Sequence, residues 1–518
     1  MHTDARTLQS GTVLEGDICI VGAGAAGITI ARELASDTRL KILLLEGGGF
    51  EREDKMQDLY RGDIVGEPYF PLQAAAEHYF GGTTNHWAGW CSTYDPIDFE
   101  KRDWVPHSGW PITRADLEPY YVRAQSIVDL GPYKWSAADW KNGDAARAPL
   151  LADSRAVWSK MWQFSPPTRF NAKYRDEIVK SPNIHLYTYA NVVEVQADDG
   201  LRAVQSVRIR TLEGKELRAH AARFVLACHT IQNARLLLAS NRQARNGLGN
   251  GNDLVGRYFM EHFEMPAAEL VLADPKLTGT RLYEFDGTGT PRAELALSPE
   301  IEKEHRILNG TASVEAGNYG DPVKSTFQFI DTVMMNKMRT WEEGGKKGPH
   351  PIAVASASLA PRGSGPPRFY HLTTRQEQAP NPDSRVTLSP EKDALGMPRA
   401  RLDWRFTDLD KRSMRTFYEI VGSEMGRTGT GRVQIRDWLL GDDRTWPSFV
   451  SGGWHHMGTT RMAADPKQGV VDANCRVHGI ANLYIGGAAV YATAGSVNPT
   501  LTLLALSLRL AEHLKTAR

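Results

Sequence analysis

The chain has 518 residues, enough for two or three conventional domains or for one large interwoven unit. Its 61 Lys and Arg residues balance 61 Asp and Glu residues, so no basic excess predicts binding to nucleic acid. Hydrophobic residues make up 41% of the chain but form no run of about eighteen, which argues against a membrane span.

The cysteines and the N-terminal residues indicate the cellular setting. The four cysteines show no C-x-x-C spacing, so we expect no metal site, and such sparse use suits a reducing compartment. Residues 1–16 lack the positive segment and the apolar run of a signal peptide. We therefore expect a cytoplasmic protein.

Residues 17–49 form the first predicted unit, which is a strand, a glycine turn, a helix and a second strand. Apolar runs at 17–21 and 41–45 predict the two strands, and helical spacing of apolar residues predicts a helix over 28–34. This order of elements is typical of a nucleotide-binding α/β domain.

The glycine turn of this unit has the chemistry to hold a dinucleotide. Gly22, Gly24 and Gly27 match G-x-G-x-x-G, which allows a tight turn, a close approach to a pyrophosphate and close helix packing. The helix N-terminus offers N–H groups to the phosphates. Glu46 ends the second strand, where a carboxylate can accept hydrogen bonds from ribose hydroxyls. The motif predicts a dinucleotide site but does not separate NAD from FAD.

Residues 77–91, EHYFGGTTNHWAGWC, form a short segment that contains glycines, hydroxyl groups, two histidines and two tryptophans. The pair Gly81 and Gly82 can bring backbone close to a flat ligand. From the residues alone, His86 is best interpreted as a core histidine, with a cofactor contact and a covalent attachment point as its alternatives.

The middle of the chain predicts mixed α/β structure followed by a mostly β region. Strand-like runs lie within 183–228, and an amphipathic helix is predicted over 230–240. From about 265 to 445, alternating segments mix with loops rich in proline and glycine, which predicts a β domain that covers the ligand. His262 is interpreted as structural, and a further helix is expected over 408–424.

Dense motifs return near the C-terminus. The run GGWHHMGTTRM covers 452–462, and N-P-T at 498–500 opens a long apolar helix after a predicted strand at 482–486. In a doubly wound sheet, ligands lie at this kind of strand-to-helix edge. His455 and Asn498 are therefore candidates for one catalytic pair, although the residues alone give His455 an equally good structural interpretation.

Three motifs together resemble those of the glucose–methanol–choline (GMC) oxidoreductases. They are the G-x-G-x-x-G with its acid, the GG-x-x-x-HW of 81–87, and the H-x-x-G-T-x-x-M of 455–462 followed by N-P-T. The runs 378–389 and 393–410 and the terminal histidine–asparagine pair are similar to those of pyranose oxidases and bacterial sugar and glycoside 3-oxidases. The resemblance implies FAD rather than NAD.

The resemblance also implies an architecture. We expect an α/β fold in which a Rossmann-like FAD-binding domain is interleaved with a mostly antiparallel β-sheet domain that binds the substrate and is flanked by helices. The FAD-binding domain would comprise 1–264 and 446–518, with a flavin-side segment at 77–130, and the substrate-binding domain 265–445.

The resemblance further implies a reaction. His455 would be the base that removes the alcohol proton, Asn498 would hold the substrate oxygen, and hydride would pass to flavin N5. The implied substrate is a pyranose sugar or glycoside, oxidised at C2 or C3 to a keto-sugar, with oxygen or a quinone-like acceptor taking the electrons. The residues that would bind FAD are Gly22, Gly24, Gly27, Glu46, Gly81, Gly82, Thr84, Asn85, His86, Trp87, Val193, Gly487, Asn498 and Thr500.

Two departures from the family pattern bear on the flavin. Ala88 stands where fungal pyranose oxidases have threonine, and residues 486–488 stand where most relatives place an aspartate. His86 matches the histidine that carries a covalent flavin link in the fungal enzymes. Because many relatives bind FAD without such a link, we expect non-covalent binding.

Other functions stay open at this point. They are oxidation of another alcohol, a GMC-fold lyase that keeps FAD as a relic, and a flavoprotein that only relays electrons. The loose loops at 273–290 and 343–367 would suit a gate for a bulky glycoside.

Overall fold

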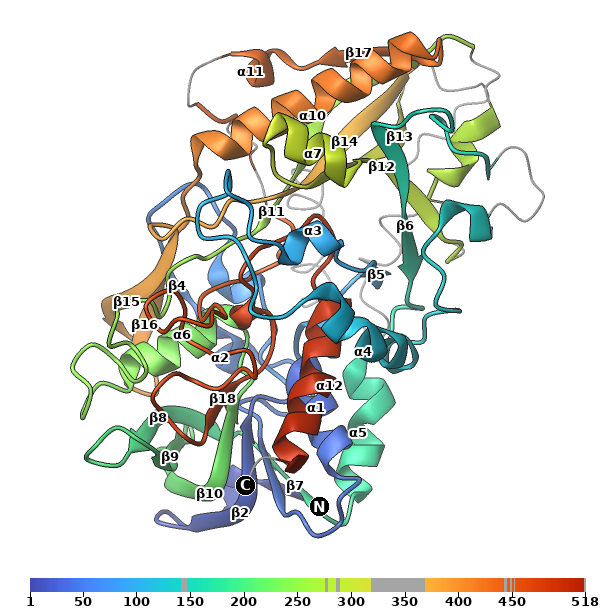
Figure 1. Cartoon of the computed structure of the whole chain (residues 1–518). Helices are drawn as coiled ribbons and strands as arrows, with labels where there is room; N and C mark the ends of the chain where they lie inside the picture. Colours follow the sequence, from blue (N-terminus) through green and yellow to red (C-terminus); the bar gives the residue numbers. More distant parts are fainter. Residues whose placement is uncertain are drawn as a thin grey trace.

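The computed structural model arranges the chain around a nucleotide-binding sheet and a large antiparallel sheet (Figure 1). The residues it describes are 1–140, 147–274, 278–285, 289–317, 369–441, 445–447, 450 and 452–516. Within these residues the strands form two large sheets and one small one. The expected fold class, an α/β unit interleaved with a mostly antiparallel sheet, is confirmed.

The first sheet is parallel where it carries the predicted nucleotide-binding unit. Across the sheet its strands are β1 (His2–Asp4), β7 (Ile184–Thr188), β3 (Ile42–Leu45), β2 (Val13–Val21), β10 (Glu216–Leu226), β9 (Val204–Arg210) and β8 (Asn191–Ala197), with β18 (Leu483–Ile485) paired with β10. The pairs of β2 with β3 and with β10 are parallel, whereas β9 pairs antiparallel with β10. The apolar runs of β2, β3 and β10 are buried, as expected for strands covered on both faces.

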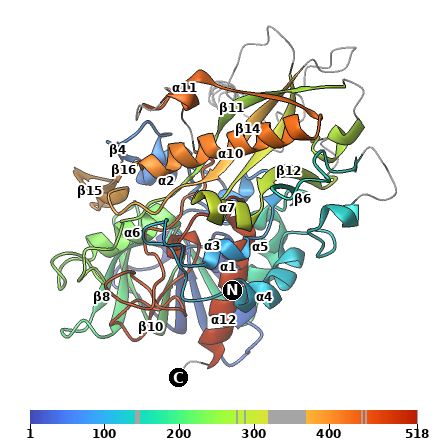
Figure 2. The same ribbon diagram turned by 45° about the horizontal axis from the view of Figure 1, so that its top comes forward.

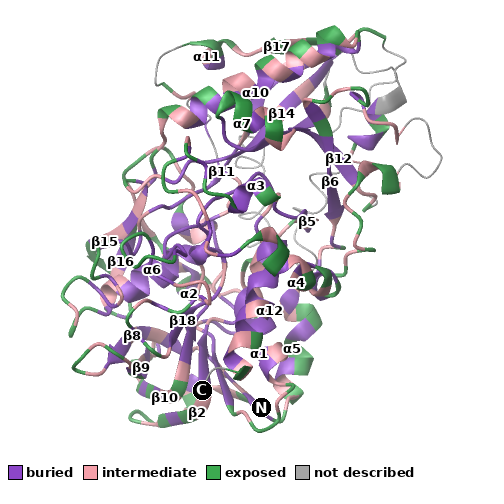
Figure 3. Ribbon diagram, in the orientation of Figure 1, coloured by how far each residue is buried: buried purple, intermediate pink, exposed green. Residues whose placement is uncertain are grey.

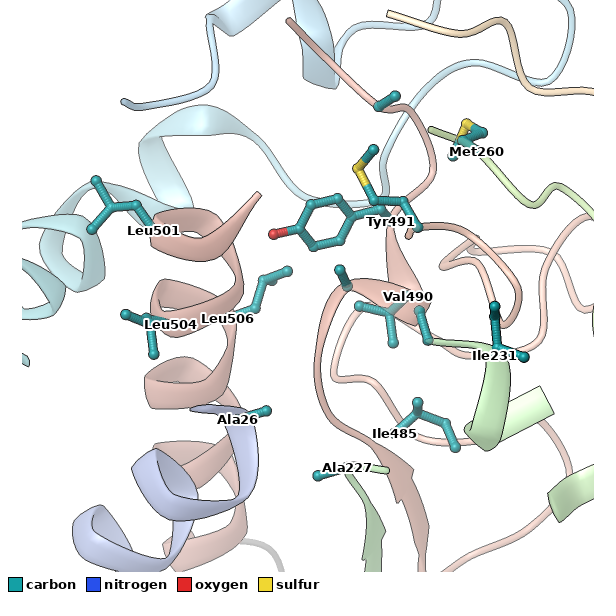
Figure 4. Close-up of a cluster of buried hydrophobic side chains, with 14 of the residues drawn as sticks. Ala26, Ala227, Ile231, Met260, Ile485, Val490, Tyr491, Leu501, Leu504 and Leu506 are labelled. Atoms are coloured by element: carbon teal, nitrogen blue, oxygen red, sulfur yellow. The ribbon is translucent and has the colours of Figure 1, made fainter. Parts of the chain in front are cut away.

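Helices pack against this sheet and against each other. The principal ones are α1 (Ala25–Leu34), α4 (Arg114–Ile127), α5 (Phe170–Lys180), α6 (Thr230–Ala239) and α12 (Thr500–Thr516). The helix predicted over 230–240 is therefore confirmed as α6. Helices α1 and α12 lie side by side, and Figure 4 shows Ala26 of α1 beside the turns of α12 that carry Leu504 and Leu506. This packing brings the start of α12 close to the glycine turn.

The second sheet is antiparallel. Across the sheet its strands are β17 (Gly431–Ile435), β11 (His262–Leu272), β14 (Phe369–Glu377), β13 (Gly310–Gly317), β12 (Arg292–Leu297), β6 (Val157–Phe164) and β5 (Trp90–Cys91). Helix α10 (Asp408–Arg427) crosses it (Figure 2), which confirms the helix predicted over 408–424. A capping box between Thr407 and Asp410 begins α10.

A small third sheet joins early and late parts of the chain. It consists of β15 (Arg385–Lys392), β16 (Pro398–Asp403) and β4 (Gly62–Ile64). The structure also has four short α-helices among the described residues: α2 (Asp54–Gln57), α3 (Pro96–Phe99), α7 (Pro299–His305) and α11 (Asp437–Leu440). Because β4, β5 and β6 come from the N-terminal part yet join the later strands, the two domains share their sheets, and the boundaries at 264 and 445 stay a prediction.

Burial follows the two large sheets (Figure 3), where the strands are mostly buried and the outer helices expose one side. Among the described helices none combines the length and the apolar character needed to cross a membrane. The predicted gate at 343–367 lies outside the described residues, and the loop at 273–290 does so in part.

Candidate active site

His455 and Asn498 lie side by side. The Nδ2 atom of Asn498 is 3.0 Å from Nε2 of His455. Asn498 stands just before α12, and His455 belongs to the segment that follows the Gly452-Gly453 pair. The structure thus brings together the two residues that the sequence suggested as a catalytic pair.

The two glycines before His455 let the backbone approach two carboxylates closely. A Cβ on Gly453 would lie 2.6 Å from both His455 Nδ1 and Glu264 Oε1. A Cβ on Gly452 would lie 2.8 Å from the carboxyl carbon of Glu261. No side chain fits at these distances, so the GG of the motif is a packing requirement.

The Glu261 carboxylate holds the backbone at His455. Its two oxygens accept the backbone N–H of His455 at 3.0 and 2.9 Å, and they also accept the N–H groups of Gly453 and His262 and the hydroxyl of Tyr69. Burial raises the pKa of Glu261 to about 7, against the effect of these donors. No sequence pattern indicates this role, because Glu261 and His455 are 194 positions apart.

Asn498 is held from two sides. Its Oδ1 accepts the indole N–H of Trp162, on β6, at 3.1 Å. The carbonyl of the next residue, Pro499, accepts the hydroxyl of buried Tyr491 at 2.8 Å. These contacts place the amide of Asn498 against the imidazole of His455.

His262 contacts the other side of His455. Its Nδ1 is 3.0 Å from His455 Nδ1, and its Nε2 is 3.1 and 2.9 Å from the carbonyl oxygens of Ala494 and Gly495. The sequence assigned it a structural role, whereas the structure places it in direct contact with the candidate base. His456 lies apart from this pair, since its ring nitrogens contact His229 and Tyr69.

Burial keeps these imidazoles neutral. Desolvation lowers the pKa of His455 well below its usual value of 6.5, and nearby His262 and Arg375 lower it further. Desolvation also lowers the pKa of His262 to about 4. A neutral imidazole can accept a proton, so His455 has the state that a general base needs.

A chain of paired charges leads away from His455 across the second sheet. Glu264 Oε1 is 3.5 Å from His455 Nδ1 and accepts the Nε–H of Arg375 at 2.8 Å. Arg375 also bonds both oxygens of Glu294 at 3.0 Å, and Glu294 accepts from Arg292 at 2.9 Å. The last three side chains are buried, and Arg292 lies over the ring of Trp90. The described surroundings of His455 on this side are therefore strongly polar.

The glycine turn has the geometry that its motif predicts. Gly22 has φ +101°, and a Cβ on Gly27 would lie 1.9 Å from Gly22 O. Gly24 is the N-cap of α1, and a Cβ there would meet nothing within 4 Å. The turn thus leaves open space directly before the N–H groups of α1.

Two other glycine segments border this space. Gly81 N donates to Ala23 O at 2.8 Å, and a Cβ on Gly82 would lie 3.1 Å from Gly24 Cα. Gly487, at φ +98°, lies near Ala26 of α1. Three predicted cofactor segments, far apart in sequence, therefore meet at the start of α1.

Two family models match this chain. One, described as GMC oxidoreductase, matches residues 380–507, and the other, described as FAD dependent oxidoreductase, matches residues 17–245. The chain belongs to the GMC oxidoreductases. It carries an FAD-dependent oxidoreductase domain and the C-terminal domain of this family.

Individual relatives of this GMC oxidoreductase are distant but extend over most of the chain. A 2-methyl-1,2-propanediol dehydrogenase of Mycolicibacterium austroafricanum is 24% identical, covering 96% of this chain and 95% of its own. A C-glycoside 3-oxidase of Microbacterium trichothecenolyticum is 26% identical over 88% of this chain and 78% of its own. A solved formate oxidase of Aspergillus oryzae has the same fold, with a TM-score of 0.57 and 17% identity over 98% of this chain and 99% of that chain.

The residues at the glycine turn of this GMC oxidoreductase fit FAD. The open space at Gly24 and the N–H groups of α1 suit a pyrophosphate. Glu46 is buried and accepts N–H groups from Ala23 and Gly48 at 2.9 Å, which leaves carboxylate lone pairs for a ribose. Beside Glu46 a pocket is lined by Gly22, Leu45, Asn191, Val192, Gln232 and Arg235.

The other predicted cofactor residues of this GMC oxidoreductase divide into two groups. Gly81, Gly82 and Gly487 border the open space, whereas the polar side chains of 84–87 bond to the protein. Thr84 donates to Gly81 O, Asn85 to Phe80 O and Trp87 to Thr168 O, while His86 Nε2 is 2.7 Å from the hydroxyl of Tyr79.

Val193 is buried in β8 beside the pocket-lining Val192, and Thr500 is the first residue of α12. Their contacts with FAD stay predictions.

Proposed function

We propose that this GMC oxidoreductase oxidises a secondary hydroxyl of a pyranose sugar or glycoside, at C2 or C3, to a keto-sugar. The observation that carries the proposal is the contact of 3.0 Å between His455 Nε2 and Asn498 Nδ2, next to a site that fits FAD. A relative named for oxidation of C-glycosides at position 3 supports the substrate class.

The two side chains divide the work on the hydroxyl group. His455 Nε2 accepts the hydroxyl proton, and the Asn498 amide donates a hydrogen bond to the same oxygen and holds it beside the imidazole. Bound at the glycine turn, FAD would supply the acceptor for the hydride of the carbinol carbon. Removal of the hydroxyl proton makes it easier for the hydride to leave the carbinol carbon. Both side chains therefore act on one hydroxyl group, which they have to position accurately.

The polar wall next to His455 supports a substrate rich in hydroxyl groups. Glu264, Arg375 and Glu294 bond to one another in one connected chain beside His455, so this side of the site is built from charged groups that donate and accept hydrogen bonds. A sterol would need an apolar wall at this place. The ring hydroxyls of a sugar match the described groups better.

We also propose non-covalent FAD and reoxidation by oxygen or a quinone-like acceptor. The contact of His86 Nε2 with the Tyr79 hydroxyl supports the first point, because it engages one of the two ring nitrogens at which a flavin link could form. The acceptor follows from the family resemblance alone.

A small aliphatic diol is the second candidate substrate. It is favoured by the full-length match to a 2-methyl-1,2-propanediol dehydrogenase. His455 and Asn498 would act on a diol in the same way. The two candidate functions therefore differ only in which substrate the polar wall next to His455 favours.

The test is anaerobic mixing of the purified holoenzyme with a panel of sugars, methyl glycosides, C-glycosides and 1,2-diols. We expect pyranoses or glycosides to bleach the flavin absorbance and NMR of the product to show a ketone at C2 or C3. Bleaching by diols alone would move the function to the second candidate. A yellow spectrum unchanged by every alcohol would indicate a lyase and contradict the proposal.

A further inference from the structure

We infer that His262 is a positioning residue: its Nδ1 fixes the proton of His455 on Nδ1 and thereby keeps the lone pair of His455 on Nε2, the atom that acts as the base. The inference rests on the proposed function only in taking His455 as the base, and it needs no particular alcohol. Three contacts lead to it, and together they allow one arrangement of protons.

The first contact fixes the tautomer of His262. Its Nε2 is 3.1 Å from Ala494 O and 2.9 Å from Gly495 O. Carbonyl oxygens only accept hydrogen bonds, so Nε2 carries the proton. Because burial lowers its pKa to about 4, His262 is neutral at neutral pH, and its Nδ1 has a free lone pair.

The second contact determines which ring nitrogen of His455 carries the proton. The two Nδ1 atoms are 3.0 Å apart, and His262 Nδ1 can only accept. His455 Nδ1 must therefore donate. A neutral imidazole has one N–H, so the lone pair of His455 is on Nε2, the atom that faces Asn498.

The third contact reaches the same answer from the opposite end. The Trp162 indole can only donate, and it is 3.1 Å from Asn498 Oδ1. The amide of Asn498 therefore turns its Nδ2 toward His455, where it donates to Nε2. The chain of donors and acceptors is consistent from Trp162 to Gly495.

The same arrangement confines the proton that His455 takes from the substrate. His262 cannot pass a proton on, because its Nε2 faces two carbonyl oxygens. Glu264, 3.5 Å from His455 Nδ1, is bonded to Arg375 and faces the charged imidazole from the side. The proton therefore leaves through Nε2, on the substrate side.

Three substitutions separate positioning from packing. His262→Asn keeps an acceptor where Nδ1 lies, whereas His262→Phe and the smaller His262→Leu remove it. We expect the apolar variants to lose about 100-fold in the rate of anaerobic flavin reduction with substrate affinity unchanged, the size of effect typical of a lost general base. His262→Asn is expected to recover at least tenfold of that loss.

A second readout needs no turnover. The ¹⁵N NMR signals of the two ring nitrogens of His455 in histidine-labelled holoenzyme, assigned by their loss in His455→Gln, show which nitrogen carries the proton. We expect Nδ1–H in the wild type and in His262→Asn, and a mixture with Nε2–H in the apolar variants. The wild-type spectrum alone contradicts the inference if the proton is on Nε2.

The kinetic probes are methyl α-D-glucopyranoside and 1,2-propanediol. If only the diol reduces the flavin, the proposed sugar substrate is wrong, and the role of His262 is then tested with the diol. If an apolar variant keeps both Nδ1–H and the full rate, and loses both only when Glu264→Gln is added, then Glu264 has the positioning role. This result overturns the inference. Equal loss in the Asn and the apolar variants, with weaker substrate binding, makes the role of His262 purely structural.

Discussion

The indole N–H of Trp162 donates to Oδ1 of Asn498 across 3.1 Å, although 336 positions separate the two residues. Trp162 lies on β6 of the antiparallel sheet, and Asn498 precedes the helix that packs on α1 of the nucleotide-binding unit. An indole only donates and an amide oxygen only accepts, so the contact also sets the orientation of Asn498. The catalytic pair thus depends on both sheets.

Substitution of Trp162 by Phe tests this dependence. The ring is retained, but Asn498 loses the donor that orients its amide. A hydrogen bond of this kind contributes about 1 kcal/mol, so we expect the anaerobic rate of flavin reduction to fall by between fivefold and tenfold. FAD content and melting temperature are the controls. An unchanged rate would show that Asn498 is oriented by other groups.

A single methyl group at position 453 is expected to displace His455. The Cβ of Gly453→Ala would lie 2.6 Å from His455 Nδ1 and Glu264 Oε1, so the imidazole has to move. A misplacement of about 1 Å costs about 100-fold in rate. Gly426→Ala, in α10, is the matched control because its Cβ meets nothing within 4 Å. Wild-type turnover in Gly453→Ala would contradict the described packing.

Gly24 distinguishes the cofactor site from the fold. Its Cβ would meet no protein atom within 4 Å, so Gly24→Ala should leave the melting temperature of the apoprotein unchanged. The same methyl group would occupy the space that we assign to the pyrophosphate. We expect FAD to dissociate at least tenfold more readily, measured by flavin fluorescence after dilution. Exposed Gly251→Ala, equally free of contacts, is expected to keep wild-type affinity.

The pH dependence of flavin reduction reports the state of His455. Burial lowers its pKa well below 6.5, so the neutral base persists on the acid side of 6.5, and the rate should stay constant from pH 8 down to about 6.5. The charged and titratable groups around it are His262, Glu264 and Arg375.

Glu261 needs a control in this titration, because burial raises its pKa to about 7 and its carboxylate holds the backbone of His455. The profile is therefore measured in Glu261→Gln as well. A loss of rate near pH 7 that disappears in this variant belongs to Glu261. One that persists would show that His455 titrates at an ordinary pKa.

Sequence reasoning was most successful where function depends on neighbours in the chain. The three glycines of the turn and the strands on either side are local, so their spacing alone predicts a nucleotide unit. His455 and Asn498 could be proposed because each stands in a compact motif, and α1 and α12 bring those motifs together.

The partners of this pair could not be predicted in the same way. His262 opens β11, and Trp162 lies on β6, so both reach the site through the packing of the antiparallel sheet. Their local sequences carry no glycine or capping signal that points to His455. The relation of Glu261 to the backbone of 453–455 is likewise a tertiary contact, between residues 192 and 194 positions apart. Only the arrangement of the sheets shows these three roles.

The most direct measurement of the central claim is anaerobic stopped-flow reduction of the flavin in wild type, His455→Gln and His305→Gln with the best sugar or glycoside. His305 is an exposed histidine at the end of α7 and serves as the control. The account predicts full bleaching in the wild type and in His305→Gln, and a rate at least about 100-fold lower in His455→Gln with FAD still bound. Reduction of His455→Gln at the wild-type rate would contradict it.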